Sequence, residues 1–321
     1  MKNIEIAGSG YAVPGRCITN HDLEKTVDTS DEWITARTGI STRYVSETEN
    51  TVSLGCRAAV NAIANAGITP ADIDLIIVAT MTGDNLTPST ACLIQEKLGI
   101  NSRHVMAFDI NAACSGFIYA MHIASAMLGQ YRCALVIGAE TLSKIIDWTD
   151  RNTCVLFGDG AGAVIMRPGE KSHMAFYADS AGDSSGTLQA TGPLLHPALE
   201  NCQRTFGYLH MDGKEVFRFA VKAIEDSIHH VLEGTGVTPE EIDLIIPHQA
   251  NIRIISYVAR KMGLPMEKFF INLDTFGNTS AASIAIAFAQ AQQQGLIRPG
   301  MKIVLVGFGA GFTNGAVYIR M

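Results

Sequence analysis

The sequence predicts an α/β protein made of two similar halves, because one segment is repeated and short apolar runs recur in both copies. The segment GITPADIDLII at 67–77 returns as GVTPEEIDLII at 236–246, with eight of eleven positions identical. The same shift of 169 residues carries ALVIG at 134–138 onto the VLVG that ends at Gly307. Several segments that share one shift indicate a duplicated structural unit.

Short strands are expected in both copies. Apolar runs such as IDLIIVA and KIVLVGF are short and flanked by turn residues. This pattern is typical of strands that are buried on both faces. Two such halves stack their sheets around shared helices, and the crevice between them is the expected place for chemistry. We expect one half at residues 1–171 and the other at 172–321, with an irregular insertion at 172–215 that contains several glycines and prolines.

Composition and charge exclude several classes of protein. The 321 residues are 47% hydrophobic and 17% charged, which suits a large buried core. The net charge of −7 argues against a nucleic-acid partner, and no stretch has the roughly 18 consecutive apolar residues that cross a bilayer. Seven scattered cysteines without a Cys-x-x-Cys pair, together with the absence of a signal peptide, indicate reduced thiols in a cytoplasmic protein.

Cys114 is the candidate nucleophile. The segment from VMAFDI through NAA to CSGFIYAMHIASAML predicts a strand, a tight turn and a helix, with Asn111 as the N-cap and Cys114 in the first turn. Free N–H groups at that helix end would stabilise a thiolate. The alternative is an inert buried cysteine. The shift that relates the halves places Ser283 opposite Cys114, which indicates a single nucleophile.

His248 and Asn278 are the candidate partners of that thiol. His248 directly follows the apolar run IDLIIP, and Asn278 lies in DTFGNTSAAS, the loop before the helix of the second copy. A pseudo-twofold would bring both residues to the same crevice as Cys114, where an imidazole can donate to a carbonyl oxygen. The alternative is that both are ordinary turn residues.

The loop GFGAGF at 307–312 is a candidate oxyanion hole. Its glycines allow backbone N–H groups to approach a ligand closely. The N–H of Cys114 and one near Gly309 or Ala310 would stabilise a tetrahedral intermediate. A tight turn at the end of a strand is the alternative.

Seven segments spread over almost the whole chain carry a resemblance to a known family. They are TSDEWITARTGI, DINAACSGF, DWTDRNTCVLFGDGAGA, MDGKEVFRFAV, IPHQANIRII, FGNTSAAS and GFGAGFT. As a set they resemble the thiolase-fold condensing enzymes, specifically β-ketoacyl-acyl carrier protein synthase III, which initiates bacterial fatty acid synthesis. The resemblance implies a five-layered αβαβα thiolase-like fold, a homodimer and a Cys-His-Asn triad of Cys114, His248 and Asn278.

The resemblance also implies a reaction. Cys114 would take an acyl group from a coenzyme A thioester, and malonyl-acyl carrier protein would then lose carbon dioxide while His248 and Asn278 stabilise the enolate. No metal or redox cofactor is expected, since acyl-CoA enters as a substrate. Thiolases carry a second cysteine near the C-terminus and elongating synthases two histidines after the nucleophile. Here no cysteine follows Cys202 and no histidine follows His248.

Substrate-binding residues follow from the same resemblance. Trp33 would stack on the adenine of coenzyme A, Arg37 and Arg151 would lie near its nucleotide, and Asn251 would line the pantetheine tunnel. Thr87 stands where many members have phenylalanine, at the acyl pocket of the partner subunit, so we expect room for a longer or branched primer. Taken alone, these residues are also compatible with a core tryptophan and solvated arginines.

Two basic stretches are candidate docking surfaces for an acidic carrier protein, although either could simply be solvated. They consist of Lys214, Arg218 and Lys222, and of Arg253, Arg260 and Lys261. The sequence gives no account of Asn314, which replaces a tryptophan frequent in the family. Three alternative functions stay open: an acyltransferase without decarboxylation, a starter-unit synthase of a polyketide pathway, and a noncatalytic coenzyme A-binding or scaffold protein.

Overall fold

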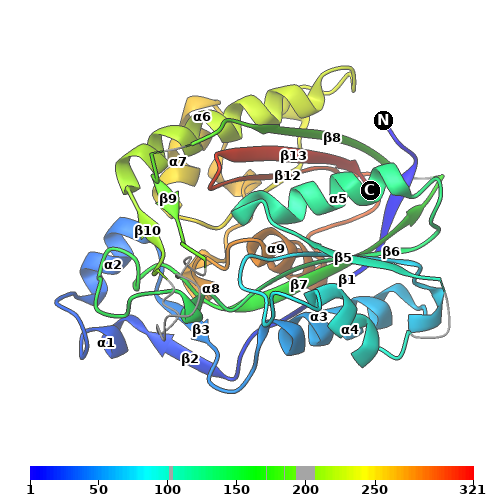
Figure 1. Cartoon of the computed structure of the whole chain (residues 1–321). Coiled ribbons are helices and arrows are strands. Elements are labelled where there is room, and N and C mark those ends of the chain that lie inside the picture. Colours follow the sequence, from blue (N-terminus) through cyan, green and yellow to red (C-terminus); the bar gives the residue numbers. More distant parts are fainter. Residues whose placement is uncertain (101–103, 171, 184, 193–206) are drawn as a thin grey trace.

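Two sheets form the frame of the protein (Figure 1). The computed structural model describes residues 1–100, 104–170, 172–183, 185–192 and 207–321. The first sheet has the order β1 (Ile4–Ala12), β7 (Gly160–Pro168), β6 (Ala134–Glu140), β4 (Leu75–Ala79) and β5 (Met106–Ile110). The second has the order β8 (His173–Ser180), β13 (Thr313–Arg320), β12 (Lys302–Gly309) and β11 (Leu244–Pro247).

The strand pairings repeat from one sheet to the other. β4 pairs with β6 in parallel and β6 with β7 in antiparallel, and β11, β12 and β13 repeat this pattern. The outer strands β1 and β8 then pair antiparallel with β7 and β13. The expected pseudo-twofold relation is therefore present in the sheet topology, and the change of sheet falls between β7 and β8.

The repeated Thr-Pro segments form the same local structure. Thr69 and Thr238 each precede a proline that opens a short 3-10 turn, Pro70–Asp72 or Pro239–Glu241. An acidic side chain at the end of each turn accepts a hydrogen bond from the N–H of the threonine. This capping box fixes where each turn begins, because proline has no N–H that needs a partner and the acidic side chain binds the N–H of the threonine.

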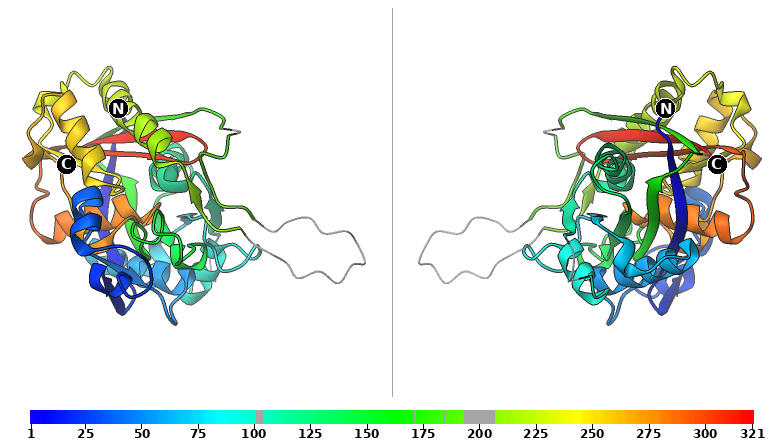
Figure 2. Two further views of the ribbon diagram at one scale, coloured as in Figure 1. Left: turned by 90° about the vertical axis from the view of Figure 1, so that its left-hand side faces the viewer. Right: turned by 90° about the vertical axis from the view of Figure 1, so that its right-hand side faces the viewer.

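Helices fill the layers around the sheets. They are α1 (Asn20–Leu23), α2 (Asp31–Thr38), α3 (Thr51–Ala66), α4 (Thr90–Lys97), α5 (Gly116–Met127), α6 (Gly213–Leu232), α7 (Ile252–Lys261), α8 (Leu273–Phe276) and α9 (Ala282–Gln293). α3 and α4 pack on the outer face of the first sheet, α5 and α9 lie between the sheets, and α6 covers the second sheet with α7 beside it (Figure 2). The expected five-layered αβαβα arrangement is confirmed.

Small residues let the central helices approach the first sheet closely. A Cβ on Gly138 of β6 would lie 2.2 Å from the carbonyl oxygen of Ala281, and one on Gly162 of β7 would lie 2.5 Å from Ala285. Most residues of α9 are fully buried, as is typical of a helix covered on all sides. The start of α9 is therefore fixed against β6.

The segment 172–215 is more regular than we expect from its glycines and prolines. Its first part is β8, which pairs with β13 along its whole length, because its apolar residues cover one side of α5. Two short strands, β9 (Leu188–Gln189) and β10 (His210–Met211), pair with each other, and β2 (Arg16–Thr19) pairs with β3 (Thr42–Val45). Residues 193–206 lie outside the described part. None of the described helices is both long and apolar enough to span a bilayer.

The close contact at Gly138 makes a stability prediction. Gly138→Ala adds a methyl group that would lie 2.2 Å from a backbone oxygen, so the start of α9 must shift. We expect the free energy of unfolding, measured by urea titration, to fall by about 1–3 kcal/mol. Gly129→Ala is the matched control, because nothing lies within 4 Å of its added Cβ. Equal unfolding midpoints for the two variants would contradict the packing argument.

Candidate active site

Cys114 lies in a short 3-10 turn, Ala113–Ser115, between β5 and α5. The expectation that Asn111 caps the helix and that Cys114 lies in its first turn is wrong by one turn, because this 3-10 turn precedes α5. The Oδ1 of Asn111 instead accepts a hydrogen bond from the N–H of Ala113, at 3.1 Å. Ala113 has a φ of 45°, which turns the chain so that Cys114 lines a cavity.

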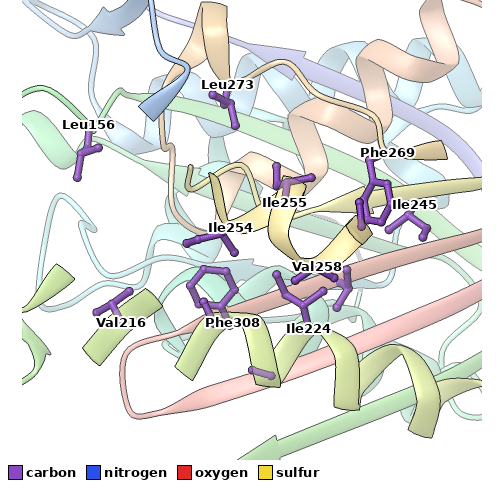
Figure 3. Packing of buried hydrophobic residues seen from close by; sticks show 14 of the residues in the cluster. Leu156, Val216, Ile224, Ile245, Ile254, Ile255, Val258, Phe269, Leu273 and Phe308 are labelled. Atoms are coloured by element: carbon purple, nitrogen blue, oxygen red, sulfur yellow. The ribbon is translucent and has the colours of Figure 1, made fainter. Parts of the chain in front are cut away.

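One cavity, of about 140 Å³, brings the expected triad together. Cys114, His248 and Asn278 all line it, although they come from different elements and from both halves of the chain. The rest of its wall is largely apolar and includes Leu156, Val216, Ile254 and Phe308, which belong to the buried cluster shown in Figure 3. A small group of polar side chains therefore lies among apolar walls.

The thiol of Cys114 is protonated in the free protein. Burial raises the pKa of Cys114 to about 12, and the hydrogen bond to Ser280 lowers it only in part. The S–H donates to the Oγ of Ser280 at 3.3 Å. The expected stabilisation of a thiolate by the helix end is outweighed by desolvation here, because almost no water reaches the sulfur. A proton must therefore leave the sulfur during any attack.

His248 is held as a neutral imidazole. The backbone N–H of His248 donates to the carbonyl of Val306 at 2.8 Å, which extends the pairing of β11 and β12 to the edge of the cavity. Its ring packs edge-on against Phe308, with the centroids 5.2 Å apart, and its Nδ1 lies 2.6 Å from the Oγ of Ser283. Burial lowers the pKa of His248 to about 3, so the ring carries no charge near neutral pH.

Asn278 is clamped by backbone and side-chain hydrogen bonds. The backbone N–H of Asn278 donates to the carbonyl of Leu156 at 2.8 Å, and its backbone carbonyl accepts from the N–H of Gly158 at 3.0 Å. Its Oδ1 accepts from the N–H of Ser280 at 2.9 Å. The amide oxygen is thereby occupied, and its NH₂ group, which donates to no atom of the described residues, is left available to the cavity.

The end of β12 lies directly against the turn that carries the thiol. A Cβ on Gly309 would lie 2.7 Å from the backbone nitrogen of Cys114, so only glycine fits at this position. Gly309 and Ala310 both line the cavity. The N–H of Cys114 donates to no acceptor within the described ranges. The structure thus places the expected oxyanion-hole residues together.

The residues expected to bind coenzyme A form a second group beside the cavity. Asn251 lines the cavity, and its Nδ2 donates to the carbonyl of Arg37 at 3.1 Å. The guanidinium carbons of Arg37 and Arg151 lie 4.9 Å and 5.1 Å from the centroid of the Trp33 ring. Arg151 also donates to the carbonyl of Asp28 at 2.7 Å. Both guanidinium groups thus lie over the ring on which the adenine is expected to stack.

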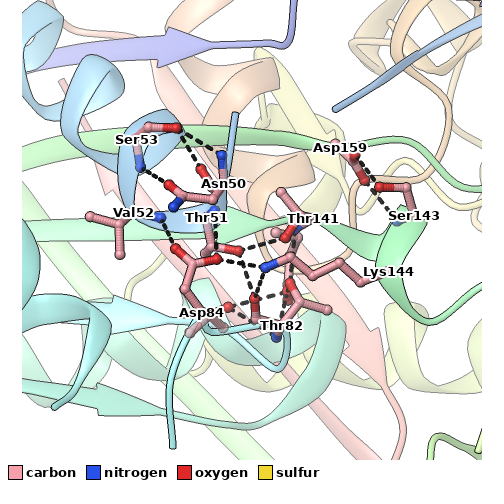
Figure 4. A network of polar contacts seen from close by, with 12 residues as sticks. Asn50, Thr51, Val52, Ser53, Thr82, Asp84, Thr141, Ser143, Lys144 and Asp159 are labelled. Atoms are coloured by element: carbon pink, nitrogen blue, oxygen red, sulfur yellow. Dashed lines mark hydrogen bonds and ion pairs between the residues drawn. The ribbon is translucent and has the colours of Figure 1, made fainter. Parts of the chain in front are cut away.

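Thr87 is exposed and does not line the cavity of its own chain. Its loop, between β4 and α4, is anchored by Asp84, which accepts hydrogen bonds from the N–H groups of Thr51 and Val52 and pairs with Lys144 at 2.6 Å (Figure 4). An acyl-pocket role for Thr87 therefore requires a second subunit, as the sequence prediction states.

A buried carboxyl group holds the start of the same loop. Glu140, at the end of β6, accepts hydrogen bonds from the hydroxyls of Thr80 and Thr82 and from the N–H groups of Met81 and Thr82. Burial raises the pKa of Glu140 to about 7 despite these donors. Met81 lines the cavity, so this cluster fixes one of its walls.

The six basic residues all lie exposed on α6 and α7. Arg218 forms an ion pair with Glu215 at 2.9 Å, and Lys261 pairs with Glu225 of α6. The remaining four, Lys214, Lys222, Arg253 and Arg260, form no ion pair with any described residue. Lys214 and Arg218 directly follow Gly213 and Phe217, which line the cavity. Arg253 lies between Asn251 and Ile254, which also line it.

Two serines of the NTSAAS motif belong to the site but were not predicted. Ser280 contacts the sulfur, and Ser283 contacts His248. The sequence shift placed Ser283 opposite Cys114. Among the described residues, however, Ala113 and Ser280 are the two non-glycine residues with positive φ, and they precede α5 and α9 at equivalent turns. This match places Ala281 opposite Cys114, because the chain from the repeated strand to this turn is two residues shorter in the second half, 34 positions from Ile246 to Ser280 against 36 from Ile77 to Ala113.

Asn314 has a structural role. It is buried on β13, and its Nδ2 donates to the Oγ of Ser227 on α6 at 2.9 Å. This hydrogen bond ties the second sheet to its outer helix. A polar side chain fits there because a buried hydroxyl group faces it.

Comparisons with known proteins agree with this arrangement. Residues 108–183 match the family described as 3-oxoacyl-[acyl-carrier-protein (ACP)] synthase III, and residues 232–321 match its C-terminal part. The β-ketoacyl-[acyl-carrier-protein] synthase III of Clostridium acetobutylicum is 49% identical over 325 residues, covering 100% of this chain and 99% of that protein.

Solved structures give the same result. The 3-oxoacyl-[acyl-carrier-protein] synthase III from Aquifex aeolicus VF5 superposes with a TM-score of 0.92 at 46% identity, over 99% of this chain and 100% of that one. The enzyme from Pseudomonas aeruginosa PAO1 gives a TM-score of 0.91 at 37% identity, over 99% and 98% of the two chains. By fold, by cavity and by similarity along its whole length, the chain belongs to the β-ketoacyl-[acyl-carrier-protein] synthase III family of acyl-transferring condensing enzymes.

Proposed function

We propose that this protein joins an acyl-CoA primer to malonyl-acyl carrier protein by decarboxylative Claisen condensation, the initiating step of fatty acid synthesis. The observation that carries the proposal is the shared cavity, in which a thiol, a neutral imidazole and a free carboxamide NH₂ group meet among apolar walls. A starter-unit synthase of a polyketide pathway is not favoured, because relatives 46–49% identical over the full chain carry the synthase III name.

In the first stage the sulfur of Cys114 attacks the carbonyl carbon of the acyl-CoA thioester. Negative charge develops on the carbonyl oxygen, and we expect the N–H of Cys114 and a backbone N–H near Gly309 or Ala310 to stabilise it, a role that the close approach of Gly309 to the nitrogen of Cys114 supports. The carbon–sulfur bond to coenzyme A then breaks. Because the Cys114 thiol is protonated at rest, its proton leaves with coenzyme A as the free thiol.

In the second stage the malonyl thioester binds with its carbonyl oxygen against His248 and Asn278. The bond to the carboxylate breaks, carbon dioxide leaves, and the electron pair forms an enolate whose charge the two donors stabilise. The enolate carbon attacks the acyl group on Cys114. The sulfur leaves as a thiolate and is protonated from solvent, and the product is 3-oxoacyl carrier protein.

The proposed reaction requires no bound metal or redox cofactor. We place the protein in the cytoplasm, which the free thiols of the described cysteines favour.

We also propose a homodimer, because β5 is an edge strand and the apolar side chains of Leu86 and Met106 are 84% and 43% exposed. An exposed edge with apolar side chains is a ready template for pairing with a second copy. No nucleic-acid or membrane partner is proposed.

The primary test is the release of carbon dioxide from malonyl-acyl carrier protein, measured with and without acyl-CoA primer. We expect release to depend on the primer and to be matched by formation of 3-oxoacyl carrier protein. An acyltransferase would transfer the acyl group without releasing carbon dioxide. A noncatalytic coenzyme A-binding protein would do neither.

Asn278→Ala separates the two stages. It removes one donor from the enolate site and leaves the N–H of Cys114 in place, so we expect the condensation rate to fall about 100- to 1,000-fold. Acylation of Cys114 by acetyl-CoA, followed by intact-mass spectrometry, should continue at a rate near that of the wild type. Equal loss of both stages would contradict a role for Asn278 at the enolate.

Arg253→Glu tests the docking surface. Arg253 is exposed, lies between the cavity-lining residues Asn251 and Ile254, and forms no ion pair with a described residue, so reversing its charge should repel an acidic carrier protein. We expect the KM for malonyl-acyl carrier protein to rise about 5- to 10-fold, with acylation by acetyl-CoA unchanged. Arg298→Glu is the control, because Arg298 is exposed, lies outside both basic stretches and forms no ion pair with a described residue; it should leave the KM unchanged.

Thr87→Phe tests the primer pocket in the proposed dimer. A phenylalanine would fill the space that threonine leaves for a branched or longer primer. We expect the ratio of kcat/KM for isobutyryl-CoA to that for acetyl-CoA to fall about tenfold or more. Thr48→Phe, at another exposed threonine, should leave the ratio unchanged. Strict preference of the wild type for acetyl-CoA would remove the hypothesis.

A further inference from the structure

We propose that Ser283 is a positioning residue that holds the imidazole of His248 in the tautomer with its proton on Nε2. The inference rests on the proposed function, since it concerns how His248 donates to the malonyl thioester. Ser283 lies in the first turn of α9 and is 2% exposed. Its Oγ lies 2.6 Å from the Nδ1 of His248, which is itself 1% exposed.

The hydrogen bonds around the hydroxyl group decide its direction. The N–H of Gln249 donates to the Oγ of Ser283 at 3.4 Å, so one lone pair of the oxygen is occupied. No acceptor other than His248 lies within hydrogen-bond distance of this hydroxyl among the described residues. The single proton of the hydroxyl is therefore directed to Nδ1, which accepts it. A neutral imidazole carries one proton, and that proton must then be on Nε2.

This tautomer is the one that the second stage requires. Enolate formation places negative charge on the malonyl carbonyl oxygen, and a ring N–H stabilises that charge. In the other tautomer, Nε2 would present a lone pair to the same oxygen and repel it. The acylation stage depends instead on the Cys114 sulfur and the backbone N–H groups, so the tautomer of His248 should affect it much less.

The buried side-chain amide of Gln249 fixes the position of His248 relative to Ser283. The Nε2 of Gln249 donates to the carbonyls of Pro247 and Phe270 at 2.8 Å and 3.1 Å, and its Oε1 accepts from the N–H of Asn272 at 3.0 Å. Asn272 in turn donates to Gln290 on α9 at 3.0 Å. The end of β11, which carries His248, is thereby tied to the helix that carries Ser283. The fold therefore holds the Nδ1 of His248 close to the Oγ of Ser283.

The kinetic test compares Ser283→Ala with the wild type in each stage. Loss of the hydroxyl leaves Nδ1 without its donor, and we expect kcat for condensation and for decarboxylation of malonyl-acyl carrier protein to fall about 10- to 100-fold. The rate of Cys114 acylation by acetyl-CoA should stay within about twofold of the wild type. Ser283→Thr keeps the hydroxyl and should restore most of the condensation rate.

Ser227→Ala is the matched control. It removes an equally buried hydroxyl on α6, the one that Asn314 contacts, and Ser227 is not among the residues that line the cavity. We expect it to lower thermal stability while both stages keep their rates. If Ser283→Ala behaved like Ser227→Ala in both stages, or if it slowed acylation and condensation equally, the proposed role of Ser283 would be overturned.

A spectroscopic measurement tests the tautomer without relying on activity. In protein labelled with ¹⁵N-histidine, long-range ¹H–¹⁵N correlation distinguishes a protonated Nε2 from a protonated Nδ1, and His248→Gln identifies the signal of His248. We expect Nε2–H in the wild type and loss of this preference in Ser283→Ala. A wild-type signal with the proton on Nδ1 would overturn the inference. Failure of the wild type to release carbon dioxide would instead overturn the proposed function.

Discussion

The close packing of α5 and α9 between the two sheets is the constraint on which the rest of the structure depends. Glycines on β6 and β7 bring the start of α9 within van der Waals distance of the first sheet, and Gly309 brings β12 onto the turn before α5. Cys114 precedes one central helix, and Asn278 and Ser283 flank the start of the other. Backbone packing therefore fixes the geometry of the chemistry, and little is left to side-chain flexibility.

Burial also sets the charge of the site. The same desolvation that raises the pKa of Cys114 lowers that of His248, so a neutral thiol faces a neutral imidazole. An ion pair of thiolate and imidazolium would suit attack on a thioester but not donation to an enolate by an uncharged N–H. The neutral site suits a protein whose two stages need different groups: backbone N–H groups in the first, and His248 with Asn278 in the second.

Much of the fold follows from the repeated segment, because its Thr-Pro turns and apolar runs reappear as capped turns and buried strands. The triad was also predictable, since Cys114, His248 and Asn278 each lie at the end or start of a predicted element. The role of Ser283 was not, because a single shift counted along the sequence cannot detect that the chain between the repeated strand and the turn before α9 is two residues shorter than in the first half. β8 was missed because glycines and prolines further along its segment obscured a strand that owes its place to α5.

The protonated, enclosed state of the Cys114 sulfur has a consequence for the chemistry of the cell. Peroxides and alkylating reagents attack thiolates that they can reach, and a buried thiol with a pKa near 12 offers them neither charge nor access. Cys17 and Cys92 lie exposed on the surface and should react first. Oxidants would then spare the Cys114 sulfur until a substrate enters the cavity and the sulfur loses its proton.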